Sequence, residues 1–314
     1  MGAGGRGILA MAGAAGIWGL APIFFKALAV VPPLEIVAHR TFWALVFLLC
    51  WLALQGRLRE VASLLGSGRL LARVMAAALL IGTNWLLFIW AVLDGRTLQA
   101  SLGYYIYPLI AVLTGRLVLG EQLSLTRWCA VALAGAAVAV LTAGLGVPPW
   151  VALALAISFA AYGLVKRGLP AGPVVSVTGE AVLLVPLALA WLVGVHFGGW
   201  VDPGGRPGAV FGTGWRDSLM LVAAGPVTAL PLILFSYAAR RLTYATLGLV
   251  QYLSPTLQAF VAALIFLEPV TRWHLIALPL IWLALALYST DLWRQERSAR
   301  KRSASSPVLP TTPT

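Results

Sequence analysis

Apolar segments of about 20 residues recur along the whole chain, and each is long enough to cross a bilayer as an α-helix. Ten of them follow one another within the 314 residues. They cover residues 8–30, 34–54, 72–93, 97–118, 123–143, 149–168, 174–195, 217–238, 242–266 and 272–292. The sequence therefore predicts an all-α integral membrane protein with ten transmembrane helices, embedded in a lipid bilayer.

The composition agrees with this fold class. Of the residues, 61% are apolar and only 10% are charged, unlike a soluble globular protein. The net charge of +12 comes from short clusters between the apolar segments and from the carboxy-terminal tail, so it indicates membrane orientation rather than nucleic-acid binding. Cys50 and Cys129 lie inside apolar segments, where they predict neither a disulfide framework nor a metal site. No nucleotide-binding P-loop occurs, and no cofactor is predicted.

The distribution of positive charge predicts the orientation of the helices. With the amino terminus inside, sixteen Lys and Arg residues lie on the inner side and four on the outer side. Positive residues favour the cytoplasmic side, so both termini are predicted to be cytoplasmic. The Gly- and Pro-rich connection 196–217 is predicted to be an irregular external loop. The basic, Ser/Pro/Thr-rich tail at 294–314 is predicted to be disordered.

An internal repeat appears at a shift of about 140 to 147 residues. The stretch "GIWGLAPIFFKAL" aligns with "AISFAAYGLVKRGL", which matches Lys26 to Lys166 and Pro33 to Pro173. Two Ala- and Leu-rich helical stretches can match by composition alone. The shared spacing of Pro, Lys and Glu argues against that alternative, because these residues are costly in lipid.

Each half of the repeat contains five predicted spans, at 1–146 and 147–293. An odd number of spans means that the second half inserts with the opposite topology. This is the inverted-repeat plan of many secondary transporters, in which the substrate site lies between the halves near the middle of the membrane.

Two ionisable residues lie deep in the predicted spans. A charge at the bilayer centre costs roughly 2.5 to 3.5 kcal/mol, so such residues are expected to face the bundle interior. Arg40 lies roughly 10 Å from the outer face at 1.5 Å per residue, and Glu180, its repeat equivalent, lies at a similar depth from the inner face. A hydrocarbon core of about 30 Å leaves roughly 10 Å between them, so a shared water-filled cavity is expected rather than a direct pair. Arg40 is the candidate for binding an anionic substrate group and Glu180 for carrying a coupled proton, with a structural polar network as the alternative.

Three further ionisable residues lie near predicted helix ends. Glu35 and His39 share one helix face at positions i and i+4, at the outer start of the second span. A carboxylate there also suits a helix amino terminus, which is the structural alternative. His39 is a second candidate for titration. Lys26, near the outer end of the first span, is a candidate for substrate contact or an anchor that reaches the interface.

Uncharged polar and aromatic residues complete the predicted substrate lining. They are Asn84, Trp85, Tyr104, Tyr105, Gln251 and Tyr252. Amide and aromatic groups can hold a small organic solute, whereas packing or an interfacial belt is the alternative for the aromatic residues. Pro108 and Pro255 lie at matched positions inside the fourth and ninth spans, where they are candidates for hinges.

Several motifs in order resemble one known family. They are "EIVAHR", "NWLLFIWAV", "SLGYYIYPL" followed by "GE", "SFAAYGLVK", "GEAVLLVP", "AAGPVTALPL" and "TLGLVQYLSPT". Over nearly the whole chain this set resembles the EamA branch of the drug/metabolite transporter superfamily, and within it the RarD group. The resemblance implies a ten-helix inner-membrane permease with five-plus-five inverted repeats, but no particular substrate. Tyr107 stands where an Asn is expected in this group, so a polar role does not carry over to that position.

The function expected from these patterns is secondary active transport, with export of a small metabolite or drug-like solute by alternating access. Protons are the candidate coupling ion. A channel or scaffold is one alternative, although no cluster of filter-like residues is evident. An intramembrane enzyme is the other: Glu35 and His39 resemble half a metal site, but the chain has only three histidines, so no complete ligand set and no metal are predicted. The sequence leaves the substrate and the oligomeric state open.

Overall fold

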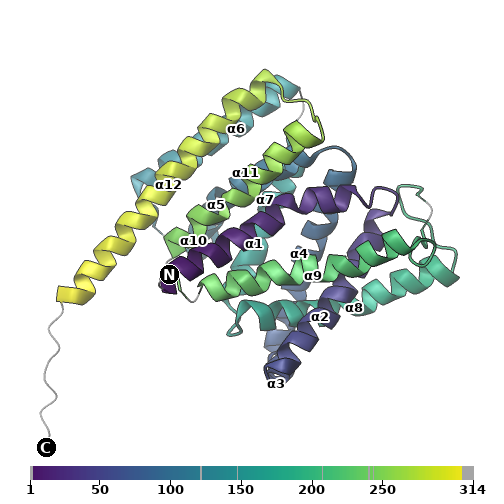
Figure 1. Cartoon of the computed structure of the whole chain (residues 1–314). Helices are drawn as coiled ribbons and strands as arrows, with labels where there is room; N and C mark the ends of the chain where they lie inside the picture. The colour runs from purple at the N-terminus through teal and green to yellow at the C-terminus, as the bar shows by residue number, and fades with distance from the viewer. Residues whose placement is uncertain are drawn as a thin grey trace, which may run out of the picture.

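The protein is a bundle of helices (Figure 1), described by a computed structural model for residues 3–120, 122–146, 148–206, 208–239, 241–242 and 244–305. Regular structure in these residues is helical throughout. The helices are α1 Ala3–Lys26, α2 Pro33–Leu54, α3 Leu58–Leu65, α4 Gly68–Leu93, α5 Thr97–Leu119, α6 Leu125–Leu145, α7 Trp150–Arg167, α8 Pro173–Phe197, α9 Trp215–Ala239, α10 Tyr244–Gln251, α11 Leu253–Phe260, a π-helical segment Val261–Ile265, and α12 Arg272–Ser305.

Eight helices in the described residues are long and apolar enough to cross a membrane. They are α1, α2, α4, α5, α6, α8, α9 and the first part of α12. Of two shorter apolar helices, Trp150–Lys166 covers most of the sixth predicted span, and Leu253–Ile265 covers only the second half of the ninth. The predicted all-helical membrane fold is therefore confirmed, whereas the count of ten depends on these two shorter helices.

Proline marks both the beginnings and the interruptions of helices. Pro33 and Pro173 are the first residues of α2 and α8, where a fixed φ angle suits a helix and the missing N–H is not needed. Near Pro255 the helical segment is divided, because α10 ends at Gln251 and α11 begins at Leu253. By contrast, α5 continues without interruption through Pro108. The two hinge candidates thus differ in local structure.

Several pairs of helices form the main contacts in the bundle, beginning with those of α2. This helix contacts α8 and α9, while α1 contacts α9, α4 and α5 contact α7, and α12 lies along α6 at one edge of the bundle (Figure 1). Close contact between α2 and α9 needs a glycine at 225, since a Cβ there would overlap the backbone of Trp43. Close contact between α5 and α7 likewise needs Gly103, whose added Cβ would lie 2.7 Å from the Ala152 carbonyl oxygen.

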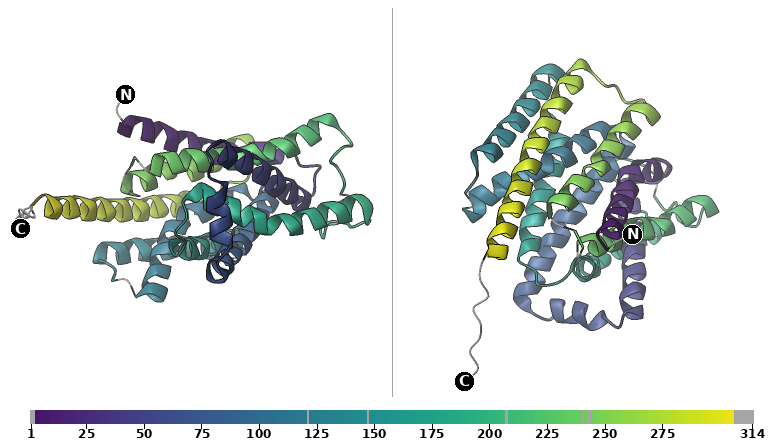
Figure 2. Two further views of the ribbon diagram at one scale, coloured as in Figure 1. Left: turned by 90° about the horizontal axis from the view of Figure 1, so that it is seen from below. Right: turned by 60° about the vertical axis from the view of Figure 1, so that its left-hand side comes forward.

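The beginning of α1 and the end of α12 lie at the same end of the bundle. The first residues of α1 and the last turns of α12 are close to one side in Figure 2, opposite the connection between α8 and α9. The sequence predicts a disordered tail from residue 294, whereas in the structure α12 continues to Ser305. Residues 292–305 contain neither Gly nor Pro and include many good helix formers, so nothing ends the helix there. Residues 306–314 lie outside the described residues.

Candidate functional site

Arg40 is a buried cation inside the bundle. Its side chain leaves α2 and is only 7% exposed. The Nε atom donates a hydrogen bond of 2.7 Å to Thr228 Oγ1 on α9. The guanidinium carbon lies 4.1 Å from the ring centroid of Trp85 on α4 and 5.7 Å from that of Phe25 on α1. Among the described residues no carboxylate forms an ion pair with Arg40, so aromatic faces and one hydroxyl hold its charge.

A polar network lies beside Arg40. The Tyr104 hydroxyl donates to Asn84 Oδ1 over 3.1 Å, and it lies close enough to the Arg40 guanidinium for electrostatic interaction. Asn84 Nδ2 donates to the Leu155 carbonyl at 3.1 Å and to Ser158 Oγ at 2.9 Å. The amide is only 1% exposed, and these bonds satisfy both ends of it. The network joins α4 and α5 to α7.

Glu180 on α8 has a complete set of partners. It is 1% exposed, and its Oε1 lies 2.6 Å from Lys166 Nζ on α7. Ser176 Oγ donates to the same oxygen at 3.1 Å, and the Tyr162 hydroxyl donates to Oε2 at 3.1 Å. Lys166, which can equally be an interfacial anchor by sequence, is thus a partner of a buried carboxylate. In the described structure Arg40 binds Thr228 and Glu180 binds Lys166, so the two charges do not pair with each other.

A series of aromatic rings connects the two charges. The ring pairs, with centroid separations, are Phe25–Phe88 at 6.3 Å, Phe88–Tyr104 at 5.7 Å, Tyr104–Phe159 at 5.9 Å and Phe159–Tyr162 at 5.7 Å. The series begins beside the Arg40 guanidinium and ends at the hydroxyl that binds Glu180. It takes residues from α1, α4, α5 and α7. We define Arg40, Trp85, Asn84, Tyr104, Glu180 and Lys166 with these rings as the central site.

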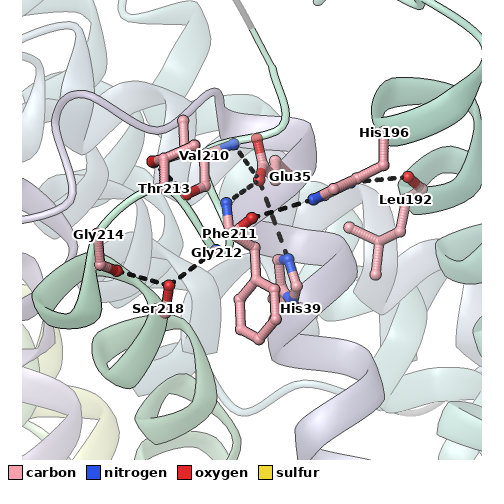
Figure 3. Close-up of polar contacts among 10 residues, drawn as sticks. All are labelled: Glu35, His39, Leu192, His196, Val210, Phe211, Gly212, Thr213, Gly214 and Ser218. Atoms are coloured by element: carbon pink, nitrogen blue, oxygen red, sulfur yellow. Dashed lines mark hydrogen bonds and ion pairs between the residues drawn. The ribbon is translucent and has the colours of Figure 1, made fainter.

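Glu35 and His39 lie in the first two turns of α2 and face the loop between α8 and α9 (Figure 3). Glu35 is fully buried, and its Oε1 accepts hydrogen bonds from the backbone N–H groups of Val210 (2.9 Å) and Phe211 (3.1 Å). His39 stacks on the Phe211 ring at 4.6 Å, and its Nε2 is 4.0 Å from Glu35 Oε1. The predicted helix-terminus carboxylate therefore binds the loop between α8 and α9 and not the N–H groups of its own helix.

Lys26 and Glu268 fix the turn between α4 and α5. Lys26 Nζ donates to the carbonyls of Val92 at 3.1 Å and Leu93 at 3.3 Å, which close α4. The Glu268 carboxylate accepts the first N–H groups of α5, from Thr97 at 2.8 Å and Leu98 at 2.7 Å. A cation is stabilising at the carboxy-terminal end of a helix and an anion at the amino-terminal end, and Lys26 and Glu268 match the ends of α4 and α5 in this way. In this structure Lys26 therefore holds a helix end and does not contact Arg40 or its partners.

The remaining predicted lining residues gather elsewhere. The Tyr105 hydroxyl is 2.6 Å from Thr256 Oγ1 on α11. Tyr105 and Tyr252 line a groove of about 190 Å³ against α12. Gln251 ends α10, and its buried Oε1 has no hydrogen-bond partner. The structure thus brings Arg40, Trp85, Asn84 and Tyr104 together and leaves these three residues apart from them.

The sequence analysis did not select Ser158, Tyr162 or Thr228, which contact or belong to the central site, and it interpreted Lys166 mainly as an interfacial anchor. Ser158, Tyr162 and Lys166 recur at every fourth position of α7, a spacing that predicts one polar face within an apolar segment. Thr228 offers a weaker signal, as a single hydroxyl among apolar residues of α9. No group of three or more His, Cys, Asp or Glu residues able to hold a metal occurs in the described part of the chain.

Buried charges within a helical bundle of this composition define a polytopic membrane protein with an intramembrane polar site. Comparisons with known proteins refine this class. The EamA-like transporter family matches residues 5–143. An uncharacterized transporter of Pseudomonas aeruginosa is 43% identical over 284 residues, covering 90% of this chain and 92% of the relative. Protein RarD of Streptomyces exfoliatus is 41% identical over 314 residues, covering 98% of this chain and 96% of the relative.

A solved structure described as "Crystal structure of protein" shares the fold, with a TM-score of 0.60 at 19% identity. It covers 92% of this chain and 98% of that chain. The chain belongs to the EamA-like transporter family and, within it, to the RarD group. It is therefore a multi-pass membrane protein of a bacterial transporter family, and the resemblance read from its motifs is confirmed.

Proposed function

We propose that this protein is a secondary active transporter that exports a small organic solute carrying an anionic group. The observation that carries this proposal is Arg40, a buried cation that stacks on Trp85 without an ion-pair partner among the described residues. A buried charge is costly unless it is paired or functional. An anionic solute provides the missing negative charge, and the neighbouring rings contact its apolar part.

The arrangement of helices supports two inverted halves. Under the predicted repeat, α1 corresponds to α7, α2 to α8, α4 to α9 and α6 to α12. The contact of α1 with α9 then corresponds to the contact of α4 with α7, and α2 packs on its own equivalent α8, as α6 does on α12. A pseudo-two-fold axis is expected to produce this pattern, because it exchanges each helix with its equivalent in the other half. The central site takes residues from both halves, as alternating access requires.

The orientation we propose has both termini in the cytoplasm of a bacterial cell and the α8–α9 loop outside the inner membrane. The excess of positive residues on one side supports it. With this orientation Arg40 lies nearer the outer face and Glu180 nearer the inner face. Protons are the proposed coupling ion, because the bundle contains buried carboxylates and histidines whose charge can change with proton binding.

Untargeted mass spectrometry of medium and cell extract tests this function. Cells would express the wild-type protein, Arg40→Gln or Arg59→Gln at equal abundance, the last being a control in the surface helix α3. We expect at least one organic anion to be enriched in the medium by the wild type and the control but not by Arg40→Gln. If the exported solutes are cations or neutral compounds, or if Arg40→Gln exports them equally well, the proposed role of Arg40 is wrong.

A further inference from the structure

The α8–α9 loop is held at Val210 and Phe211 by side chains that can change charge (Figure 3). The N–H of Phe211 donates to Glu35 on α2 over 3.1 Å. The carbonyl of Phe211 accepts from His196 Nε2 on α8 over 3.3 Å. The Phe211 ring stacks on His39. We call Glu35, His39, His196 and the Val210–Phe211 backbone the loop latch.

Both ring nitrogens of His196 face carbonyl oxygens. Its Nδ1 is 3.0 Å from the Leu192 carbonyl oxygen, and its Nε2 faces the Phe211 carbonyl oxygen. Carbonyl oxygens only accept hydrogen bonds, and a neutral imidazole carries a single N–H. Both contacts can be hydrogen bonds at once only when His196 is protonated. The closed loop is therefore matched to the imidazolium form.

Charge balance leads to the same conclusion. Glu35 is fully buried, and its only ion-pair contact among the described residues is His39 at 4.0 Å, which carries charge only when protonated. His39 is 4% exposed, and neither of its ring nitrogens has a hydrogen-bond partner. Oε2 of Glu35 is also buried without a partner. One proton on a histidine of the latch would balance the carboxylate, and the two carbonyl contacts place that proton on His196.

Other ionisable groups on the surrounding elements do not contact the latch side chains in the described structure. They are Lys26 on α1, Arg40 on α2, Asp202 and Arg206 in the loop, and Arg216 and Asp217 on α9. Lys26 binds the end of α4, and Arg40 binds Thr228. Asp202 accepts from Gly204 N–H, and Arg206 donates to the Ala29 carbonyl.

We propose that the loop latch is a proton-binding site, and that proton binding at His196 holds the α8–α9 loop closed. This inference rests on the proposed function for its role in transport. In an exporter that exchanges solute for protons, a proton taken up from outside after solute release would close the outer side before the transporter turns inward. Loss of the proton leaves the Phe211 carbonyl without a charged donor and weakens the closed loop.

Labelling of one cysteine in the loop tests the proposal. Cys50 and Cys129 are exposed and would first be changed to Ala. Val210→Cys keeps the backbone N–H that Glu35 accepts. Its labelling rate would be divided by the rate for the same protein unfolded in sodium dodecyl sulfate, which corrects for thiol ionisation. We expect the corrected rate to rise several-fold from about pH 6 to about pH 8, a range that includes the ordinary titration of histidine.

Variants identify the responsible group. His196→Gln replaces the imidazole with an uncharged amide, so the Phe211 carbonyl has no charged donor at either pH. We therefore expect this variant to label fast at both pH values. His274→Gln, which lies outside the latch, should behave like the parent. Equal rates at both pH values in the parent, or unchanged pH dependence in His196→Gln, would overturn the proposal. Loss of pH dependence in His39→Gln or Glu180→Gln but not in His196→Gln would place the controlling proton elsewhere and also overturn it.

The chain has only three histidines, so nuclear magnetic resonance of ¹³C-histidine-labelled protein gives a direct second measurement. The resonance lost in His196→Gln should titrate together with the labelling rate. Solute export, measured separately, distinguishes the two proposals. Export with a pH-insensitive loop refutes the latch and leaves the function standing, whereas a pH-sensitive loop without export of any solute refutes the function.

Discussion

Arg40 and Glu180 occupy equivalent positions in the predicted repeat, yet their surroundings differ. Glu180 has an ion-pair partner and two hydroxyl donors, so both of its oxygens are occupied. Arg40 has one hydroxyl and two ring faces, and no carboxylate pairs with it among the described residues. The difference indicates that Glu180 is complete without a ligand, whereas Arg40 has capacity left for one. Four variants test this contrast, beginning with the largest expected effect.

Removing Lys166 should destabilise the protein most. Lys166→Met leaves the Glu180 carboxylate buried without a cation, and breaking such a pair typically costs about 3 to 5 kcal/mol. We expect the lower part of this range, because the Lys166 side chain is 21% exposed. Unfolding by sodium dodecyl sulfate in mixed micelles measures the change. The double variant Lys166→Met/Glu180→Leu should recover most of the loss; if it is as unstable as the single variant, the ion pair is not the cause.

Arg40→Gln should reduce transport strongly while changing stability little. A hydrogen bond to a charged group contributes about 1.5 to 3 kcal/mol, so solute affinity should fall by about tenfold or more. No described carboxylate is left unpaired, so the free energy of unfolding should change much less than in Lys166→Met. Solute binding and micelle unfolding on the same preparation separate the two effects. Severe destabilisation with normal transport would reverse the roles assigned to Arg40 and Glu180.

Trp85→Leu should give an intermediate loss of solute affinity. The ring lies 4.1 Å from the Arg40 guanidinium carbon, and a cation–π contact contributes about 0.5 to 2 kcal/mol. Trp85→Phe keeps an aromatic face and should retain more affinity than Leu. Binding measured for both variants checks the order, and equal losses would show that ring size rather than the aromatic face is what matters.

Tyr162→Phe should have the smallest effect. It removes the hydroxyl that donates to Glu180 Oε2 but keeps the ring that stacks on Phe159. We expect a loss of about 1 kcal/mol in the free energy of unfolding, the usual contribution of one hydrogen bond. The same change combined with Lys166→Met should cost more than the sum of the two single changes, since the carboxylate then loses two partners. If the losses in the free energy of unfolding for the two single variants simply add in the double variant, the two contacts to Glu180 act independently.

Much of the candidate site was within reach of sequence reasoning, and part of it was not. Arg40, Trp85, Asn84 and Tyr104 were selected because polar and ionisable groups in apolar segments are costly, and the structure brings them together. The same reasoning placed Tyr105, Gln251 and Tyr252 with them, although they contact other helices. The free-energy cost of a polar or ionisable side chain in lipid indicates that the residue needs a partner, but it does not indicate which residue that partner is. Both lysines illustrate this, since Lys26 binds a helix end and Lys166 a carboxylate.

The α8–α9 loop shows the same limit more strongly. Its Gly and Pro content predicts an irregular external connection, but no local pattern predicts that two of its N–H groups bind a carboxylate roughly 175 residues earlier. The continuation of α12 past the last predicted span, to Ser305, was not predicted for the opposite reason. There the local helix preference of residues 292–305 was outweighed in the prediction by their charge and polarity.

The sequence by itself determined that the chain is an all-helical membrane protein, its family and the beginnings of α2 and α8. These properties follow from hydrophobicity, proline geometry and motif order, which act over short stretches of chain. Only the tertiary structure decided that Glu180 pairs with Lys166, that Arg40 stacks on Trp85 and that Glu35 holds a distant loop. Such partners depend on how helices rotate and tilt against one another, because the long-range packing of many side chains sets those angles, and no single segment encodes it.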